Sequence, residues 1–300
     1  MTLDQLRIFL AVAEHGHVTR AARSLGMTQS AVSAAISALE NRYGTRLFDR
    51  VGRGIELTET GRRFVPEARA VIDRASEARS ALEDLSNLAS GTVSIAASQT
   101  IATYWLPRRI TSYHLEHPGI RLNVVIGNTR EVERAVVGGT ADIGLVEGPT
   151  GHPALVRRTV DRDHLVLVVA PGQDRIPRTS QGDIDIRGFS WVVREAGSGT
   201  RQALEDEAER RGLKFEDLRV FLVLPSNEAV REAVEAGAGA TIISEHVVAA
   251  AIRAKRLRAL PVDLPPRDFV LLRHSERQPG AAARALIDVF TATKPQRLAS

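Results

Sequence analysis

The sequence contains no cysteine, and this absence excludes several classes of function at once. Without thiols the chain cannot form disulfides, thiolate metal sites or a cysteine-based redox switch. It also has no run of about 18 apolar residues, so we expect no membrane-spanning helix and no membrane partner. The N-terminal stretch MTLDQLRIFL lacks the basic flank and cleavage site of a signal peptide, so we expect a cytoplasmic protein.

Motifs typical of enzymes are missing as well. The sequence has no HExxH, GxSxG or Walker A pattern, and the glycine-containing segment 197–200 lacks the lysine of a P-loop. The GxG that begins at Gly237 precedes an expected strand instead of following one, so it does not fit a dinucleotide fingerprint. We therefore expect no catalytic residues, no cofactor and no metal site.

The length and charge suggest several domains, one of which binds nucleic acid. Three hundred residues exceed one typical domain, and a hydrophobic content of 43% is ample for globular cores. Residues 1–66 contain nine arginines and six acidic residues, so most of the net charge of +4 lies there. Such an asymmetry indicates a nucleic-acid partner for this segment, although an excess of this size also arises by chance.

Residues 19–43 predict two short helices separated by a tight break at Gly26 and Met27. The second helix has apolar residues at i, i+4 and i+7, namely Val32, Ile36 and Leu39. Its start is small, polar and uncharged, and we expect it to contact DNA through Thr28, Gln29, Ser30 and Ser33. This pattern is typical of a helix-turn-helix whose second helix enters the major groove, and the alternative is an ordinary corner between two helices.

The segment 44–57 predicts a short hairpin, because glycines interrupt it and apolar residues then alternate with polar ones. Arg50 and Arg53 lie at this hairpin, where they would reach phosphates or a narrow minor groove. A solvated arginine in a turn is the alternative for Arg53. Thr58 is expected to cap the following helix.

The helix expected after Thr58 has a stripe of apolar residues, and Pro66 is expected to kink its first turns. The stripe has spacings of four and three: Phe64, Ala68, Val71, Ala75, Ala78, Leu82, Leu85 and Ala89. This heptad pattern is typical of a coiled coil, and a second copy of the chain is the simplest partner. Packing of the stripe onto the chain's own domain is the alternative.

From residue 92 onward, short β-branched runs alternate with helical stretches, which predicts α/β units with largely parallel strands. The expected strands are 92–97, 121–126, 142–146, 165–170, 190–193, 219–223, 240–243 and 269–273. The expected helices are 105–116, 131–137, 201–211, 228–236 and 281–293.

Polar residues at the ends of these strands predict a ligand site. They are Ser98, Gln99, Thr100, Asn128, Glu147, Ser198, Gly199, Thr200 and Ser226. Two strand ends that lead into helix N-termini would clamp a small anion, because free N–H groups and the helix dipole favour negative charge there. Alternatively, Ser98 and Thr200 are only N-caps. Glu147 in the site would repel an anion, unless the ligand carries a proton or an amine or the glutamate itself is protonated. The alternative is that Glu147 is a surface carboxylate near a turn.

Residues 3–61 read LDQLRIFLAVAEHGHVTRAARSLGMTQSAVSAAISALENRYGTRLFDRVGRGIELTETG. This sequence resembles the DNA-binding domain of LysR-type transcriptional regulators. The resemblance implies an α/β protein with an all-α N-terminal part. Its domains would be a winged helix-turn-helix at 1–60, a dimerisation linker helix at 61–90 and an effector domain of type 2 periplasmic-binding-protein fold at 91–300. The effector domain would have two lobes joined by two crossover strands, namely 91–162 with 267–300, and 163–266.

The motifs SQTIATYWLP, GNTREVERAVVGGTADIGLVEGP, REAGSGTR and SNEAV are similar to the branch of that family that controls sulfur assimilation and carbon fixation. The resemblance implies a small anionic effector, with sulfite or sulfate ahead of a sugar phosphate, nucleotide or small carboxylate. It also implies a pseudo-palindromic site on double-stranded DNA, a homodimer or homotetramer, and RNA polymerase as a partner. The alternatives outside this class are a transport-type solute-binding protein and an architectural DNA-binding protein.

Overall fold

The computed structural model describes residues 1–51, 54–85, 91–148, 150–173 and 175–292. The chain divides into two compact units, Met1–Leu82 and Glu83–Ser300. Among the described residues, no helix is long and apolar enough to cross a membrane.

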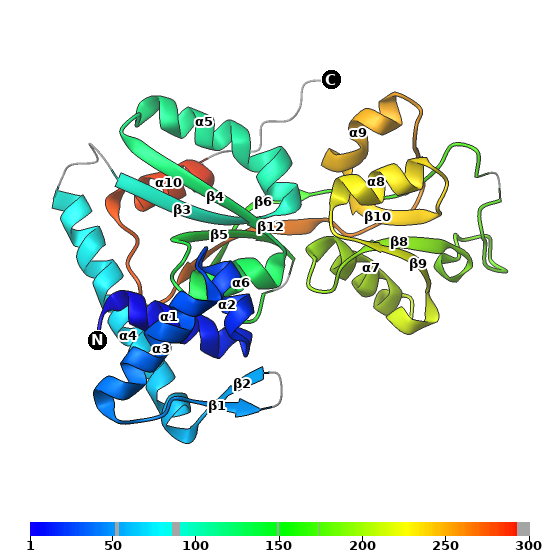
Figure 1. Ribbon diagram of the computed structural model, residues 1–300. Coiled ribbons are helices and arrows are strands. Elements are labelled where there is room, and N and C mark those ends of the chain that lie inside the picture. Colours follow the sequence, from blue (N-terminus) through cyan, green and yellow to red (C-terminus); the bar gives the residue numbers. More distant parts are fainter. Residues whose placement is uncertain (52–53, 86–90, 149, 174, 293–300) are drawn as a thin grey trace. The chain divides into compact units, whose positions relative to one another are not determined.

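The first unit is a bundle of three short helices followed by a hairpin and a long helix (Figure 1). Its elements are α1 (Leu3–His15), α2 (Val18–Ser24), α3 (Gln29–Tyr43), β1 (Phe48–Val51), β2 (Gly54–Leu57) and α4 (Glu59–Leu85). Gly16 ends α1 with φ 57°, and Gly26 has φ 64° at the break after α2, conformations that glycine adopts without steric cost. These elements confirm the expected helix-turn-helix and its hairpin.

The core of the first unit joins all three short helices to the start of α4. Val32, Ile36 and Leu39 of α3 are buried against Phe9 of α1, as their spacing predicts. The hairpin and α4 are connected through Thr58, whose Oγ1 accepts a hydrogen bond from the backbone N–H of Gly61 at 2.9 Å. The α4 helix continues through Pro66 as one element.

The start of α4 divides its apolar residues between two faces. Phe64, Ala68 and Ile72 pack into the core of the first unit, as the alternative interpretation of the stripe anticipated. Val71 and Ala78, by contrast, are exposed. Ala89 and the expected end of this helix lie outside the described residues.

The second unit contains two mixed sheets, which we call lobe one and lobe two together with the helices that cover them (Figure 1). The lobe-one elements are β3 (Gly91–Ser98), η1 (Ile101–Trp105, a π-helical turn), α5 (Leu106–Glu116), β4 (Ile120–Gly127), α6 (Thr129–Val137), β5 (Ile143–Glu147), β6 (Leu155–Asp163), β12 (Arg267–His274) and α10 (Ala281–Ala292). The lobe-two elements are β7 (Leu165–Val169), β8 (Ser190–Arg194), α7 (Gly199–Arg210), β9 (Arg219–Leu224), α8 (Asn227–Glu235), β10 (Ala240–Ser244), α9 (Glu245–Arg253), β11 (Arg258–Leu260) and the 3-10 turns η2 (Ile186–Gly188) and η3 (Phe215–Asp217).

Helices cover both faces of each sheet. In lobe one, α5 and α10 pack on the face that carries Ile95 and Leu145, while α6 packs on the face that carries Ala96 and Val146. In lobe two, α7 packs against Trp191, and α8 and α9 pack on the opposite face. Burial of both faces explains why the central strands are short apolar runs without polar alternation.

Pairing within the sheets is only half parallel, so the expectation of largely parallel strands is wrong. The strand orders are β4-β3-β5-β12-β6 and β11-β7-β10-β8-β9. β3 is parallel to β4 and β5, and β8 is parallel to β9 and β10, whereas β12, β6, β7 and β11 join by antiparallel pairing. The antiparallel strands are those that connect the lobes.

Two chain segments cross between the lobes: β6 of lobe one is followed directly by β7 of lobe two, and β11 of lobe two leads back to β12 of lobe one. A buried ion pair holds this crossing, since Arg267 Nε donates to Asp163 Oδ2 at 2.8 Å. The hydroxyl of Ser244 donates to the other carboxylate oxygen of Asp163 at 2.6 Å. The two-lobed architecture is therefore tied together at its crossover by a charged network with almost no solvent exposure.

Candidate functional site

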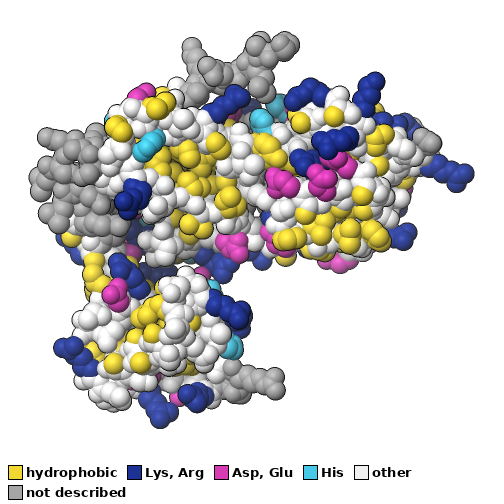
Figure 2. All heavy atoms as spheres, turned by 45° about the horizontal axis from the view of Figure 1, so that its top comes forward, with side chains coloured by type: hydrophobic (Ala, Val, Ile, Leu, Met, Phe, Trp, Pro, Cys, Tyr) yellow, Lys and Arg dark blue, Asp and Glu magenta, His cyan; other side chains and the backbone are white. Residues whose placement is uncertain are grey.

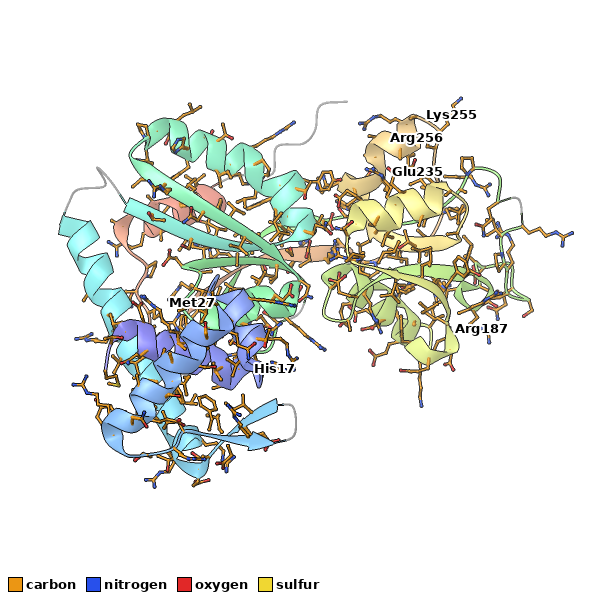
Figure 3. The ribbon with its side chains drawn as sticks, in the orientation of Figure 1. His17, Met27, Arg187, Glu235, Lys255 and Arg256 are labelled. Atoms are coloured by element: carbon orange, nitrogen blue, oxygen red, sulfur yellow. The ribbon has the colours of Figure 1, made fainter. Side chains whose placement is uncertain are left out.

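The exposed start of α3 presents the side chains that the sequence assigns to DNA contact. Thr28 caps the helix, with its Oγ1 accepting from the N–H of Ala31 at 3.2 Å. Thr28, Gln29, Ser30 and Ser33 are all exposed. Figure 3 shows His17 and Met27 at the two ends of α2, with Met27 in the turn that leads into α3.

A hydrogen bond between α2 and α3 orients one of these side chains. Thr19 Oγ1 donates to Gln29 Oε1 at 3.0 Å. The amide nitrogen of Gln29 therefore remains available as a donor at the exposed end of the helix. In the hairpin, Arg50 lies exposed on β1, and Arg53 lies outside the described residues.

A second group of candidate site residues lines a small cavity of about 10 Å³ between the two lobes of the larger unit. Its lining is Ser98, Gln99, Thr100, Gly127, Asn128, Thr129, Glu147, Arg194, Ser198, Gly199, Thr200 and Asn227. The structure thus brings together all the strand-end residues named from the sequence except Ser226. Ser226 instead caps α8, accepting from the N–H of Ala229 at 3.0 Å.

Asn227 is at the centre of the network around this cavity. Its Nδ2 donates to Thr100 Oγ1 at 3.0 Å, and its Oδ1 accepts from Thr200 Oγ1 at 3.1 Å. Its backbone N–H donates to Gln99 Oε1 at 2.7 Å. Ser198 caps α7, because its Oγ accepts from the N–H of Thr200. Ser98 and Thr200 are therefore not the N-caps of the alternative interpretation: the hydroxyl of Thr200 donates to Asn227, and Ser98 Oγ caps no helix among the described residues.

Arg194 is a buried charge that the sequence reasoning missed. Its guanidinium makes two hydrogen bonds to the carboxylate of Glu195, at 2.8 and 2.9 Å, and its Nη1 donates to Gln99 and to Asn227. Burial by itself would raise the pKa of Glu195, but the hydrogen bonds and positive charge of Arg194, together with hydrogen bonds from the backbone and from Asn128, hold that pKa below its ordinary value. A signal was present in the sequence, because Arg194 ends an apolar strand as the other site residues do.

Glu228 completes the contacts between the lobes. Its carboxylate accepts from Gln99 Nε2 at 3.0 Å and from the hydroxyl of Tyr104 at 3.1 Å. Burial, followed by the nearby charge of Glu228, raises the pKa of Tyr104, so its hydroxyl stays protonated as a donor. Residues of lobe one are thus hydrogen-bonded to residues of lobe two at several points around the cavity.

Three buried polar atoms at the cavity have no hydrogen-bond partner: Ser98 Oγ, Thr129 Oγ1 and Glu147 Oε1. Glu147 is only 3% exposed, so it is not the surface carboxylate of the alternative interpretation. Leaving a buried polar group unpaired costs about 1–3 kcal/mol, and three of them at one cavity indicate a place prepared for another molecule. The cavity has room for about one water molecule, so a larger ligand requires the lobes to move apart.

Comparison with known proteins identifies the chain's family. Residues 86–294 match the LysR substrate binding domain, and residues 3–62 match the bacterial regulatory helix-turn-helix protein, lysR family. The chain belongs to the LysR family of transcription regulators. It is accordingly a DNA-binding regulator with a separate ligand-binding domain.

Individual relatives cover nearly the whole chain. The HTH-type transcriptional regulator YeiE of Escherichia coli K12 is 33% identical over 292 residues, which is 96% of each chain. The RuBisCO operon transcriptional regulator of Allochromatium vinosum is 31% identical, covering 94% of this chain and 93% of its own. The regulatory domain of CcmR from Synechocystis PCC6803, solved in complex with 2-PG, shares the fold with a TM-score of 0.59 at 24% identity, over 68% of this chain and 97% of that one.

Proposed function

We propose that this LysR-family regulator responds to a small oxyanion, sulfite or sulfate, bound between its two lobes. The observation that carries the proposal is the set of unpartnered polar atoms on Ser98, Thr129 and Glu147 around one small cavity. The N-termini of α6 and α7 border the same cavity through Thr129 and Gly199, and helix N-termini favour anions. A compact ligand suits so small a space better than an extended one.

The buried carboxylate of Glu147 restricts the protonation state of the ligand. An ionised carboxylate repels a fully ionised anion at close range, and low exposure removes the water that would screen the repulsion. A ligand that carries a proton, such as hydrogensulfite, can donate that proton to Glu147 Oε1 in a hydrogen bond. Sulfite therefore ranks ahead of sulfate, because near neutral pH sulfite is partly protonated whereas sulfate is not.

A phosphorylated metabolite is the alternative effector of the same site, ahead of a nucleotide or a small carboxylate. Its support is that the CcmR domain was solved with 2-PG and that several relatives are named as RuBisCO regulators. Such a ligand is larger than sulfite, so it would require a wider separation of the lobes. Either ligand acts on DNA binding only if it prefers one arrangement of the lobes over another.

On the DNA side, Thr28, Gln29, Ser30 and Ser33 are proposed to contact base edges and adjacent phosphates in the major groove. Arg50 and Arg53 are proposed to hold the sugar-phosphate backbone from the hairpin. Those contacts should weaken steeply as the salt concentration rises. The proposed target is a pseudo-palindromic site on double-stranded DNA, with RNA polymerase as the partner at the promoter, and the protein is proposed to act in the cytoplasm.

A homotetramer is the proposed assembly, built from dimers that pair through the 61–90 segment. The exposed Val71 and Ala78 of α4 support pairing through that helix. Figure 2 shows hydrophobic side chains gathered over both lobes of the larger unit, and large apolar residues are exposed on two edge strands. They are Val124, Val125 and Ile126 on β4 and Phe221 and Val223 on β9. The proposed domains are 1–60, 61–90 and 91–300, and the proposed lobes are 91–162 with 267–300, and 163–266.

Thermal unfolding of the full chain with sulfite, sulfate, thiosulfate, 2-PG and acetate tests the effector. A ligand at about 100 times its Kd adds roughly 2.7 kcal/mol to the free energy of unfolding, which shifts the midpoint by several degrees. We expect sulfite to give the largest shift and Ser98→Ala to reduce it without lowering the midpoint of the free protein. Ser112→Ala, an exposed serine on α5, is the matched control. A shift with 2-PG alone, or a sulfite shift unchanged by Ser98→Ala, would overturn the oxyanion assignment.

A further inference from the structure

We propose that the larger unit contains a second ligand site, for an aliphatic organic anion, in a cavity of about 730 Å³ between β6, β12 and α7. Its size lies within the range of about 300–1,000 Å³ usual for small-molecule sites. Among the described residues, Gly199 lines both this cavity and the small one, so the two sites adjoin at the start of α7.

The argument for an anion begins with Arg267. This guanidinium is about nine-tenths buried and faces Asp163 through Nε and Nη2, while its Nη1 has no hydrogen-bond partner. An arginine prefers planar, two-point contact with a carboxylate or phosphate, and here one donor nitrogen is left over for a ligand.

Thr150 supplies a second unpartnered group. Its Oγ1 is buried without a hydrogen-bond partner, and its backbone carbonyl accepts a hydrogen bond from Arg157 Nη1. Arg157 therefore lies beside Thr150 with further N–H groups to donate. Each buried polar atom without a partner calls for an explanation, and two of them belong to residues that line this one cavity.

A β-bulge explains how three side chains of β6 reach the cavity. Thr159 pairs with Val270 and Asp161 with Phe269, so Val160 is an extra residue in β6. Because side chains alternate along a strand, an extra residue changes which of them face one side. Arg157 and Thr159 before the bulge and Arg162 after it therefore line the same cavity.

The carboxylates of the cavity already have partners in the protein. Glu207 is bound by Arg210 at 2.8 Å and by Arg211 at 2.6 Å. Asp268 lies 3.4 Å from Arg162, and Asp206 accepts from Gln202 at 2.8 Å. The buried donor without a partner is thus on Arg267, and Arg157 has N–H groups besides the one bound to Thr150, which favours an anionic head group at that end.

The other residues that line the cavity are apolar, which indicates a ligand with a carbon skeleton and not a bare inorganic ion. They include Leu165, Ala203, Leu264, Pro265, Pro266 and Val270. No aromatic side chain is among the described lining residues, so a nucleobase would find no ring to stack on. We therefore assign the site to a carboxylate or phosphate carried on an aliphatic chain or a sugar.

Such a ligand would touch both lobes. β6 and β12 belong to lobe one and α7 to lobe two, and Arg267 forms the ion pair at the crossover. A molecule that binds both sides stabilises the lobe arrangement in which it fits best, and so it changes the affinity of the small cavity through linkage.

Calorimetric titration of the full chain tests the site, with citrate, glutarate, ribose 5-phosphate and glycerol 3-phosphate as probes and inorganic phosphate as the comparison. We expect at least one organic probe to bind with Kd below about 1 mM and more tightly than phosphate. Arg157→Gln and Thr150→Val should each weaken it about tenfold, since each removes a donor to the ligand. Arg158→Gln is the matched control, because Arg158 is the next residue of the same strand and does not line the cavity.

Three results would overturn the proposal. The first is that no organic probe binds below about 1 mM, and the second is that inorganic phosphate binds as tightly as all of them. The third is that Ser98→Ala, in the small cavity, weakens the probe as much as Arg157→Gln does. The last result would place the probe in the small cavity and leave the proposed effector site standing.

Discussion

Asn227 of lobe two donates from its side-chain nitrogen to Thr100 Oγ1 of lobe one at 3.0 Å. The same amide accepts from Arg194 and Thr200, so one buried side chain connects the end of β8, the start of α7 and the end of β3. Asn227 is 1% exposed, and water cannot replace these partners. The lobes are therefore held together at the small cavity by polar contacts that a ligand must rearrange.

Asn227→Ala should destabilise the larger unit. The change leaves buried donors on Arg194 and Thr200 and a buried hydroxyl on Thr100 without their partner, so the free energy of unfolding should fall by about 1–3 kcal/mol. Urea denaturation of the full chain measures it. Asn123→Ala, at an exposed position of β4, is the matched control and should change stability by less than about 0.5 kcal/mol. Equal effects of the two changes would contradict the role of Asn227.

Gly199→Ala should push the lobes apart at the small cavity. A Cβ at Gly199 would lie 2.9 Å from the backbone oxygen of Glu147 and 3.3 Å from its Cβ. Overpacking costs about 1–3 kcal/mol, which exceeds the gain of up to about 1 kcal/mol from helix propensity. We expect a lower unfolding midpoint and weaker sulfite binding in thermal unfolding scans. Gly172→Ala, where a Cβ meets nothing within 4 Å, should leave both quantities unchanged.

The sequence predicted the first unit closely, because each of its helices has a clear start, a clear stop and a regular apolar spacing. Thr28, Gly26 and Gly16 all act as their residue types suggest. Polar residues at the ends of the expected strands predicted most of the small cavity's lining, because the carboxyl ends of parallel strands meet at one edge of a sheet. Charged residues at strand ends, had they been included, would have predicted Arg194 as well.

Three of the strands and helices were not predicted from the sequence, because their residues show no clear apolar periodicity or boundary. β6 reads LVRRTVDRD, which is half charged, because this edge strand exposes most of its residues and carries a bulge. α9 follows β10 without any connecting residues, and Ser244 both ends the strand and caps the helix, so no break marks the change. β11 has three residues, too few for a periodic signal. The antiparallel pairing of the crossover strands depends on contacts far apart in the sequence.

Glu195 should make stability depend on pH in the acidic range. Its pKa is lowered in the folded protein: burial opposes the shift, and the hydrogen bonds and charge of Arg194 outweigh it together with hydrogen bonds from the backbone and from Asn128. The stabilisation is fully present above the unfolded-state pKa, near the ordinary value of 4.5, and is lost as pH falls through the lower folded-state pKa. Glu195→Gln should therefore lower the unfolding midpoint at pH 7 and have less effect at pH 4. A midpoint difference that is the same at both pH values would contradict the assignment.

Val125→Glu should weaken the association of dimers into tetramers. Val125 is 66% exposed on the edge strand β4, and a charge there would have to be desolvated in any contact that covers this edge. We expect sedimentation to show the mass of a dimer, because Val125 lies outside the helix α4 through which the dimer is proposed to pair. Val156→Glu is the matched control, since Val156 is exposed on β6 at the opposite edge of the same sheet. Loss of association with both variants would argue against a specific contact at β4.

Gln29→Ala should weaken binding to the specific DNA site by about 1–3 kcal/mol and leave non-specific binding nearly unchanged, because the amide is proposed to contact a base edge. Thr19→Val should reproduce part of this loss, since the hydroxyl of Thr19 holds Gln29 Oε1 at 3.0 Å. Arg50→Ala provides the contrast: a lost phosphate contact weakens specific and non-specific binding alike and lowers the slope of affinity against salt by about 1. Fluorescence anisotropy at several salt concentrations separates the two patterns. If Gln29→Ala weakens both kinds of site equally, Gln29 contacts the backbone and the specificity of α3 rests on Ser30 and Ser33.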